Sequence, residues 1–344
     1  MAARVPVLQL VATRRAKSLF DLVAGFSYSQ IVQAAVESGL LDHLFHGPKN
    51  AAAIGIATGL SEAAALRLLR AAAALDLAEE AAADQWVLGQ QGAVLHANPG
   101  AQAMVRHHHL LYADLADPMA LLRADRSRPT ALSDFWTYAR NEPRPGRSAA
   151  EYSELMAVSQ AMVGREIRAT YNFGRHRSVL DIGGGHGRFA MQLADSHRQL
   201  RIGLFDLPEV VVQATAQLEA AKLTNRIAVH PGDFFRDGIP LGYDCHTLVR
   251  ILHDHDDNRA AELLAASRRA LAPGGHLVIA EPMAGIPGAE AVQAYFEMYL
   301  WAMGSGRPRF PQEIGTMLRE AGFTRVRKVP LPQPLISSAI VASF

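Results

Sequence analysis

Apolar residues follow two different patterns along this chain. Over residues 20–122 they recur mostly at helical spacing, as in the alanine-rich stretch 61–77, where Leu66, Leu69 and Leu77 would share one face. After about residue 170, short runs rich in β-branched and other apolar residues alternate with helical patterns. These runs are 178–182, 201–205, 227–230, 245–251 and 276–280. Strand and helix in this rhythm predict a parallel sheet with right-handed crossovers.

The end of the chain departs from that alternation. A helix over 311–321 is followed by two strand-like runs, near 323–329 and 336–341, which we expect to close the sheet as a hairpin. The predicted fold class is α/β, a Rossmann-like, doubly wound and mostly parallel sheet, preceded by an all-α domain.

The order of elements in the helical part resembles a winged helix. A helix over 51–58, a turn at Gly59, a capped helix from Ser61 and a short strand pair that includes 85–88 follow one another. Residues 1–100 carry 7 Lys and Arg against 8 Asp and Glu. A duplex-binding module needs a concentrated basic face, so we expect a dimerisation or lid role and no nucleic-acid partner.

A Pro- and Arg-rich stretch, 123–147, separates the two patterns and is expected to be a linker or surface loop. It carries 6 Arg against 3 acids, which at most allows weak peripheral contact with an anionic membrane. A helix over 149–170 follows. The predicted domains are 1–122, a winged-helix-like dimerisation domain; 123–165, a linker with a substrate-pocket helix; and 166–344, the catalytic domain.

Length and charge describe an ordinary globular protein. The 344 residues have a formal net charge of +1 and are 49% hydrophobic, enough for about two full domain cores. Cys245 is the single cysteine, which rules out an internal disulfide and favours a reducing compartment, the cytoplasm. Arg14, Arg15 and Lys17 interrupt the N-terminal region, so we expect no signal peptide, and no apolar stretch reads as long enough to span a bilayer.

A glycine run follows the first strand of the predicted sheet, Asp181-Ile182-Gly183-Gly184-Gly185-His186-Gly187. Glycines let the backbone approach a ligand closely, and the next helix presents its N-terminal amides. The spacing also satisfies a dinucleotide fingerprint, with Asp206 in the place of a ribose-binding acid, so a nicotinamide oxidoreductase stays open as an alternative.

Two further acids favour a different cofactor. The carboxylate of Asp181, directly before the glycines, suits an ammonium group and would repel a pyrophosphate. Asp233 and Phe234 end the third strand with the pair of groups that hydrogen-bonds and covers an adenine ring.

His253 is the candidate catalytic base. It follows an apolar strand, 247–252, at the edge where open α/β folds bind ligands, and Glu281 ends the next strand. Methyl transfer from a sulfonium to a hydroxyl needs in-line geometry and removal of the hydroxyl proton. Glu281 can orient the imidazole and stabilise its cation.

We expect activity without a metal. His107, His108 and His109 are consecutive, so a helix would point them about 100° apart. The acids after His253 are explained as caps of the next helix by Asp256 or Asp257.

Taken together these motifs resemble the caffeate-type and hydroxyindole-type O-methyltransferases, class I enzymes that use S-adenosylmethionine. The resemblance rests on the glycine run and on the segments 205–208, 232–235, 252–254 and 273–281. It implies a homodimer, His253 as base and Glu281 as its partner. It also implies that the cofactor contacts Gly183, Gly185, Asp206, Asp233, Phe234 and Arg250, with Asp206 at the ribose and Asp233 near the adenine.

One position departs from the family pattern. Where the family often has a second carboxylate beside the histidine, this chain has Pro308. Either Glu281 suffices, or another acid such as Asp254 shares its task.

Segments 21–26, 107–114, 250–257, 281–285 and 302–309 are most similar to the bacterial carotenoid branch, the hydroxyneurosporene or demethylspheroidene O-methyltransferases. That similarity implies a small apolar acceptor, methylated at a tertiary hydroxyl at the C1 end of an acyclic carotenoid. A polyene needs a long apolar channel. The residues proposed to line it are Met156, Met298, Tyr299 and Met303, with Met162, Phe296 and Trp301.

Two alternatives keep the same cofactor: a phenolic or polyketide O-methyltransferase, and a bacteriochlorophyll-type C-methyltransferase.

Overall fold

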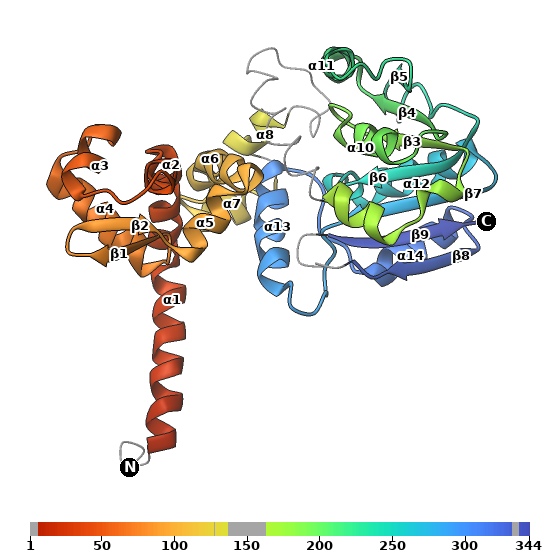
Figure 1. The fold of residues 1–344 in the computed structure, drawn as a ribbon. Helices are drawn as coiled ribbons and strands as arrows, with labels where there is room; N and C mark the ends of the chain where they lie inside the picture. The colour runs from red at the N-terminus through yellow and green to blue at the C-terminus, as the bar shows by residue number, and fades with distance from the viewer. Residues whose placement is uncertain (1–5, 127, 137–162, 332–336) are drawn as a thin grey trace. The chain divides into compact units, whose positions relative to one another are not determined.

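A computed structural model describes residues 6–126, 128–136, 163–331 and 337–344. The chain forms two compact units, Met1–His109 and Leu110–Phe344. The boundary lies inside helix α6, Pro99–Asp114. Figure 1 shows the order of the elements along the chain.

The first unit is helical with one small hairpin. Its elements are α1 (Pro6–Glu37), α2 (Leu40–Phe45), α3 (Ala51–Thr58), α4 (Glu62–Ala74), β1 (Ala78–Ala82), β2 (Gln85–Leu88), α5 (Gln90–His96) and the start of α6. The predicted cap of α4 is confirmed, because the Ser61 side chain accepts a hydrogen bond from the Ala64 N–H at 3.2 Å. β1 and β2 pair antiparallel, as the winged-helix pattern predicted. Leu40, Ile54, Leu69 and Trp86 form the centre of this unit's core.

Helix α1 differs along its length. Ala35 and Val36 near its end are buried in the core of the first unit. On the N-terminal side of these residues, the helix exposes a set of large apolar side chains: Leu19, Phe20, Leu22, Val23 and Phe26. By length and composition the stretch Val11–Glu37 could cross a membrane. The expectation that no stretch is long enough was wrong by that criterion, because Leu, Val, Ile and Phe residues over 19–36 raise the mean hydropathy although polar residues interrupt them.

The second unit contains the predicted sheet, which the described residues build with seven strands in the order β5-β4-β3-β6-β7-β9-β8. The parallel strands are β3 (Ser178–Ile182), β4 (Arg201–Asp206), β5 (Ile227–Pro231), β6 (Tyr243–Val249) and β7 (Leu271–Glu281). β9 (Ser338–Ser343) pairs antiparallel with both β7 and β8 (Arg325–Val329), which confirms that these last two strands close the sheet.

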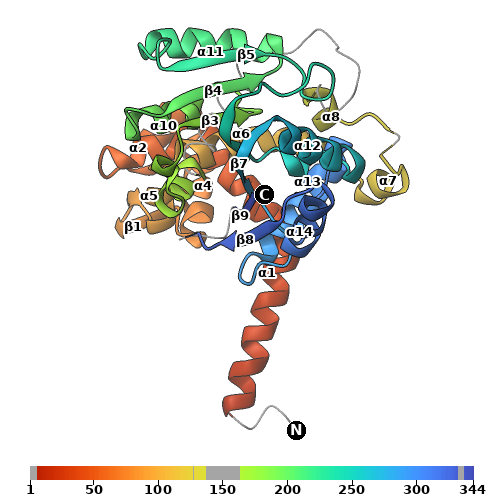
Figure 2. The ribbon, with the colours of Figure 1, turned by 90° about the vertical axis from the view of Figure 1, so that its right-hand side faces the viewer.

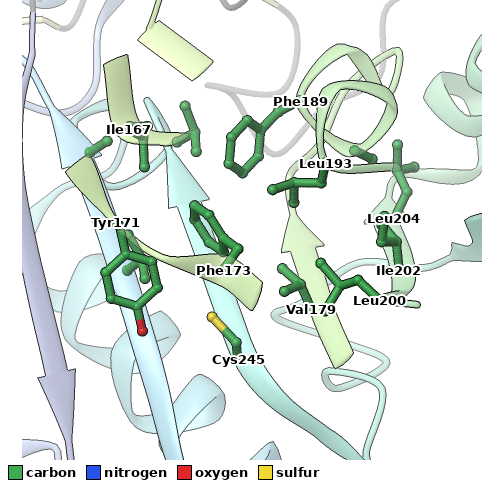
Figure 3. Packing of buried hydrophobic residues seen from close by; sticks show 14 of the residues in the cluster. Ile167, Tyr171, Phe173, Val179, Phe189, Leu193, Leu200, Ile202, Leu204 and Cys245 are labelled. Atoms are coloured by element: carbon green, nitrogen blue, oxygen red, sulfur yellow. The ribbon is translucent and has the colours of Figure 1, made fainter. Parts of the chain in front are cut away.

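Helices cover both faces of the sheet (Figure 2). Residues 163–170, α10 (Arg188–Ser196) and α11 (Pro208–Ala220) pack on one face, and α12 (Asp257–Ala270) and α14 (Pro311–Glu320) pack on the other. Successive strand residues point to opposite faces, so Val179 belongs to the first core and Leu180 to the second. Figure 3 shows the first core, where Phe189 and Leu193 of α10 pack near Phe173 and Cys245.

The predicted linker is more ordered than its composition suggested. It contains the end of α7 (Pro118–Arg123) and all of α8 (Ala131–Phe135), which Thr130 caps through its side chain. The Arg126 guanidinium lies 4.7 Å from the centre of the Trp301 ring, on α13 (Glu290–Met303). Arg126 is therefore not simply solvated, because its guanidinium packs on an aromatic face. Residues 137–147 lie outside the described part of the chain.

Candidate active site

The carboxyl ends of four parallel strands bring the predicted site residues to one edge of the sheet. The glycine turn follows β3, Asp206 ends β4, the turn that contains His253 follows β6, and Glu281 ends β7. β3 pairs with both β4 and β6, and β6 pairs with β7. This edge is where open α/β sheets bind their ligands.

The glycine turn has the backbone conformation that only glycine adopts without strain. Gly183, Gly185 and Gly187 have φ values of +68°, +56° and +77°. The Gly183 N–H donates to the Phe205 carbonyl at 2.8 Å, and the Gly185 N–H donates to the Asp206 carboxylate at 2.7 Å. The turn is thereby fixed against the end of β4, directly before α10.

Two carboxylates lie beside this turn, that of Asp181, which is buried, and that of Asp206, which is half-buried. Burial raises the pKa of Asp181 to about 7, although a hydrogen bond from the Thr247 hydroxyl at 2.7 Å opposes the rise. Burial also raises the pKa of Asp206 to about 6, against the hydrogen bonds from Gly185 and Leu207. Buried carboxylates of this kind are stabilised by a nearby positive charge. The residues therefore fit a cationic ligand better than a pyrophosphate.

Asp233 and Phe234 follow β5, beside the same edge. The Asp233 carboxylate accepts the Phe235 N–H at 2.8 Å and lies 3.5 Å from the Arg236 guanidinium. The Phe234 ring packs edge-on against Phe235 and His255. Both side chains are half-buried, which leaves part of each accessible to a ligand.

His253 lies between two carboxylates. Its Nδ1 contacts the Glu281 carboxylate, and its Nε2 lies 3.1 Å from Asp254 Oδ1. The imidazole and the Glu281 side chain are both buried. Because both ring nitrogens face carboxylate oxygens, the arrangement stabilises the imidazolium that forms when the neutral ring accepts a proton, since both nitrogens are then donors.

The charge balance around His253 agrees with that form. Burial alone would lower the pKa of this histidine, and the nearby Arg250 acts in the same direction. The carboxylates of Asp254 and Glu281 outweigh both effects, so the pKa of His253 is raised above its ordinary value.

Arg250 and the aromatic residues of α13 surround the imidazole. Arg250 is buried, with φ +57°, and its guanidinium lies 6.0 Å from the centre of the Phe296 ring. The Phe296 ring packs against His253 with 5.8 Å between ring centres. The base therefore lies against an apolar surface on one side.

The predicted channel residues have different environments. Tyr299 is buried and accepts a hydrogen bond from the Trp136 indole N–H at 2.8 Å. Met303 is buried, and Met298 is half-buried on the same helix. Met156 and Met162 lie outside the described residues. A role in substrate binding stays a prediction for all of them.

The acids after His253 do not cap the next helix as expected. Asp256 occupies the N-cap position of α12, but its side chain makes no capping hydrogen bond there. It accepts instead from the Gly306 N–H at 3.0 Å and the Arg126 guanidinium at 3.0 Å. Within the part of the chain that is described, no group of three or more His, Cys, Asp or Glu has the arrangement of a metal site.

The family resemblance placed the segment around Pro308 beside the histidine, but sequence reasoning missed the hydrogen bonds that Ser305, Arg307 and Arg309 donate to the backbone of the His253 turn. The glycines at 304 and 306 are the sequence signal that could have pointed to an unusual backbone conformation, but they do not specify these contacts.

Comparison with known proteins agrees with this geometry. Residues 112–324 match the family model of the O-methyltransferase domain. The demethylspheroidene O-methyltransferase of Cereibacter sphaeroides is 38% identical, over 99% of this chain and 90% of the relative. The enzyme of the same name from Rhodobacter capsulatus is 40% identical, over 98% of this chain and 85% of the relative.

Solved structures show the same fold over nearly the whole chain. Human N-acetylserotonin methyltransferase in complex with SAM matches with a TM-score of 0.79 and 23% identity, covering 96% of this chain and 97% of that one. Mitomycin 7-O-methyltransferase matches with a TM-score of 0.80 and 22% identity, covering 98% of this chain and 100% of that one. By its sequence and its fold, this chain belongs to the O-methyltransferase family.

Proposed function

We propose that this chain transfers a methyl group from S-adenosylmethionine to a hydroxyl of an acyclic carotenoid, and that His253 accepts the hydroxyl proton. The observation that carries this proposal is the buried imidazole between Glu281 and Asp254 at the carboxyl edge of the sheet. The acceptor class is supported by the two demethylspheroidene O-methyltransferases, which match over nearly the whole chain.

S-Adenosylmethionine supplies an electrophilic methyl group on a sulfonium sulfur when it is bound. Asp181, directly before the glycine turn, fits this cation because burial disfavours its charged form unless a positive charge is near. We assign Asp206, at the end of β4, to the ribose. Gly183, Gly185, Asp233, Phe234 and Arg250 complete the set that we assign to the cofactor. The backbone amides of the turn and of α10 lie where polar groups of the cofactor would bind.

His253 acts on the acceptor hydroxyl. While the hydroxyl oxygen is methylated, His253 would accept its proton at Nε2; the bound cofactor would supply the methyl group and keep the sulfur electron pair of the broken bond. Glu281 orients the ring through Nδ1. Asp254, 3.1 Å from Nε2, stabilises the imidazolium that forms and takes the place of the second carboxylate that Pro308 does not provide.

An apolar acceptor is supported by the Phe296 ring, which packs against His253, with the Tyr295 ring beside it on α13. Met156, Met298, Tyr299 and Met303 are assigned to the channel for the polyene.

A homodimer completes the proposal. The apolar side chains of α1 form an exposed surface whose contact with water is unfavourable. The partner that covers this surface is a second copy of the chain. We assign dimerisation to residues 1–122, the linker and pocket helix to 123–165, and cofactor binding to 166–344. The enzyme is assigned to the cytoplasm, with weak peripheral contact at the inner membrane.

The test is methyl transfer from labelled S-adenosylmethionine to 1-hydroxyneurosporene, with 3-amino-4-hydroxybenzoate in a parallel reaction. The second acceptor is chosen because the enzyme of Streptomyces cremeus that methylates it is 30% identical over 94% of this chain. We expect a labelled methoxy carotenoid and no labelled benzoate. Label in the benzoate alone would overturn the assignment of a carotenoid acceptor, while the assignment of O-methyltransferase activity would stand.

A further inference from the structure

The turn that contains His253 is bound from outside by a second segment, residues 305–309, which we call the bracing segment. Four successive backbone carbonyls of the turn accept a hydrogen bond from it. The Arg309 guanidinium donates to Leu252 O at 2.8 Å and to His255 O at 2.6 Å. The Arg307 N–H donates to His253 O at 2.9 Å, and the Ser305 hydroxyl donates to Asp254 O at 2.7 Å.

Gly306 brings the two segments close together. It has φ +76°, and a Cβ at this position would lie 1.9 Å from His253 O. Its N–H donates to the Asp256 carboxylate at 3.0 Å. Any side chain at Gly306 would therefore push directly on the backbone of the catalytic residue.

Arg309 contributes charge as well as hydrogen bonds. Its side chain is 1% exposed, and its guanidinium pairs with Asp257 at 2.8 Å. A buried guanidinium needs both a counter-charge and hydrogen-bond acceptors, and here the acceptors are the carbonyls on either side of His253. Removal of Arg309 leaves those carbonyls without these donors.

Glu281 binds the same turn from the other side. Its carboxylate accepts the Ile251 N–H at 3.0 Å and the Leu252 N–H at 2.7 Å, and also contacts the imidazole. The turn is therefore fixed through its N–H groups by Glu281 and through its carbonyls by the bracing segment.

We propose that the bracing segment is a positioning element for His253, with Gly306 and Arg309 as its positioning residues. It acts on the backbone of the turn, so that the imidazole stays against Glu281 and Asp254. In this chain the segment around Pro308 thus contributes to catalysis by placing the base and not by presenting a carboxylate. This inference rests on the proposed role of His253 as the base.

Gly306→Ala tests the close approach, with Gly304→Ala as its matched control. Gly304 also has a positive φ, +91°, but a Cβ there would meet only the Ser133 side chain, at 3.9 Å. Both variants therefore carry the backbone strain, and only the first displaces His253. Arg309→Gln removes the donors to the turn without adding bulk.

The readouts are the pKa of the His253 imidazole by NMR in the full chain, and kcat with the chain's own acceptor. For Gly306→Ala and Arg309→Gln we expect the pKa of His253 to fall and kcat to decrease by about 100-fold, the size of effect that a displacement of about 1 Å produces. Gly304→Ala should change neither. Thermal stabilisation by S-adenosylhomocysteine should persist in every variant, which shows that the fold and the cofactor site remain.

An unchanged pKa in both Gly306→Ala and Arg309→Gln, or the same change in Gly304→Ala, would overturn the proposal. The NMR titration requires no acceptor, so it can be completed even if the wild-type chain methylates neither acceptor tried. If only the proposed function fails, the wild type will be inactive with both acceptors, but the pKa of His253 will still fall in Gly306→Ala and Arg309→Gln.

Discussion

The Glu281 carboxylate binds His253 twice over, at the imidazole Nδ1 and through the N–H groups of the turn that carries it. Orientation of the base and conformation of the catalytic turn therefore depend on one side chain. Two adjacent parallel strands, β6 and β7, produce this arrangement, because their carboxyl ends lie side by side.

Glu281→Gln keeps the size of the side chain and removes its charge. We expect the chain to fold, because the amide oxygen still accepts backbone N–H groups, and kcat to fall by about 100-fold, since the imidazolium loses its buried counter-charge. Steady-state kinetics with labelled cofactor measure this. Glu262→Gln, on the exposed face of α12, is the control and should match the wild type. Equal values of kcat for the two variants would show that Glu281 does not contribute to catalysis.

The rate should depend on pH through His253. The base accepts a proton only when it is neutral, so the rate falls as the pH drops below its pKa. The nearby carboxylates raise that pKa, which places the midpoint above about 6.5. Asp254→Asn should move the midpoint to lower pH. A profile of kcat from roughly pH 5 to pH 9 measures both, and a midpoint that does not respond to Asp254→Asn contradicts the assignment.

Binding of S-adenosylmethionine should weaken in acid. Asp181 and Asp206 have pKa values raised to about 7 and about 6, so both become neutral as the pH falls through this range. Asp181 then loses its attraction for the cation, and Asp206 becomes a weaker hydrogen-bond acceptor for the ribose hydroxyls. Calorimetry between roughly pH 8 and pH 5.5 should show a Kd that rises by about 10-fold, equivalent to about one pKa unit. Asp206→Asn should flatten part of this dependence, and a pH-independent affinity in the wild type would exclude the electrostatic role.

The exposed stripe of α1 predicts a self-association surface. Leu22 and Phe26 have 78% and 75% of their surface exposed. Leu22→Asp with Phe26→Asp should convert a dimer into a monomer in sedimentation experiments, because charges at an apolar interface are left without partners. Val212→Asp changes an equally exposed residue on α11 and should leave the dimer intact. A wild-type monomer would rule out this use of α1.

Much of the catalytic unit could be predicted from the sequence because its signals are local. The central strands are short, mostly apolar runs, and the predicted range 178–182 coincides with β3. The contact between His253 and Glu281 followed from parallel strands, whose ends share an edge. The helix α8 was not predicted, since five residues with a threonine cap are too short to show a helical period.

The contacts around the catalytic turn could not be predicted in the same way. That Asp254 faces the imidazole of the residue before it depends on the conformation of a single turn of 3-10 helix, Leu252–Asp254. The hydrogen bonds of Arg309 join residues more than fifty positions apart in the chain. Neither periodicity nor strand order carries that information.

The most direct test of the central claim is single-turnover methyl transfer by His253→Gln with saturating labelled S-adenosylmethionine and 1-hydroxyneurosporene. His46→Gln, which changes an exposed histidine of the first unit, is the control. We predict that His253→Gln binds S-adenosylhomocysteine normally and transfers methyl at least about 100-fold more slowly than the control. Transfer at the same rate in both variants would contradict the account.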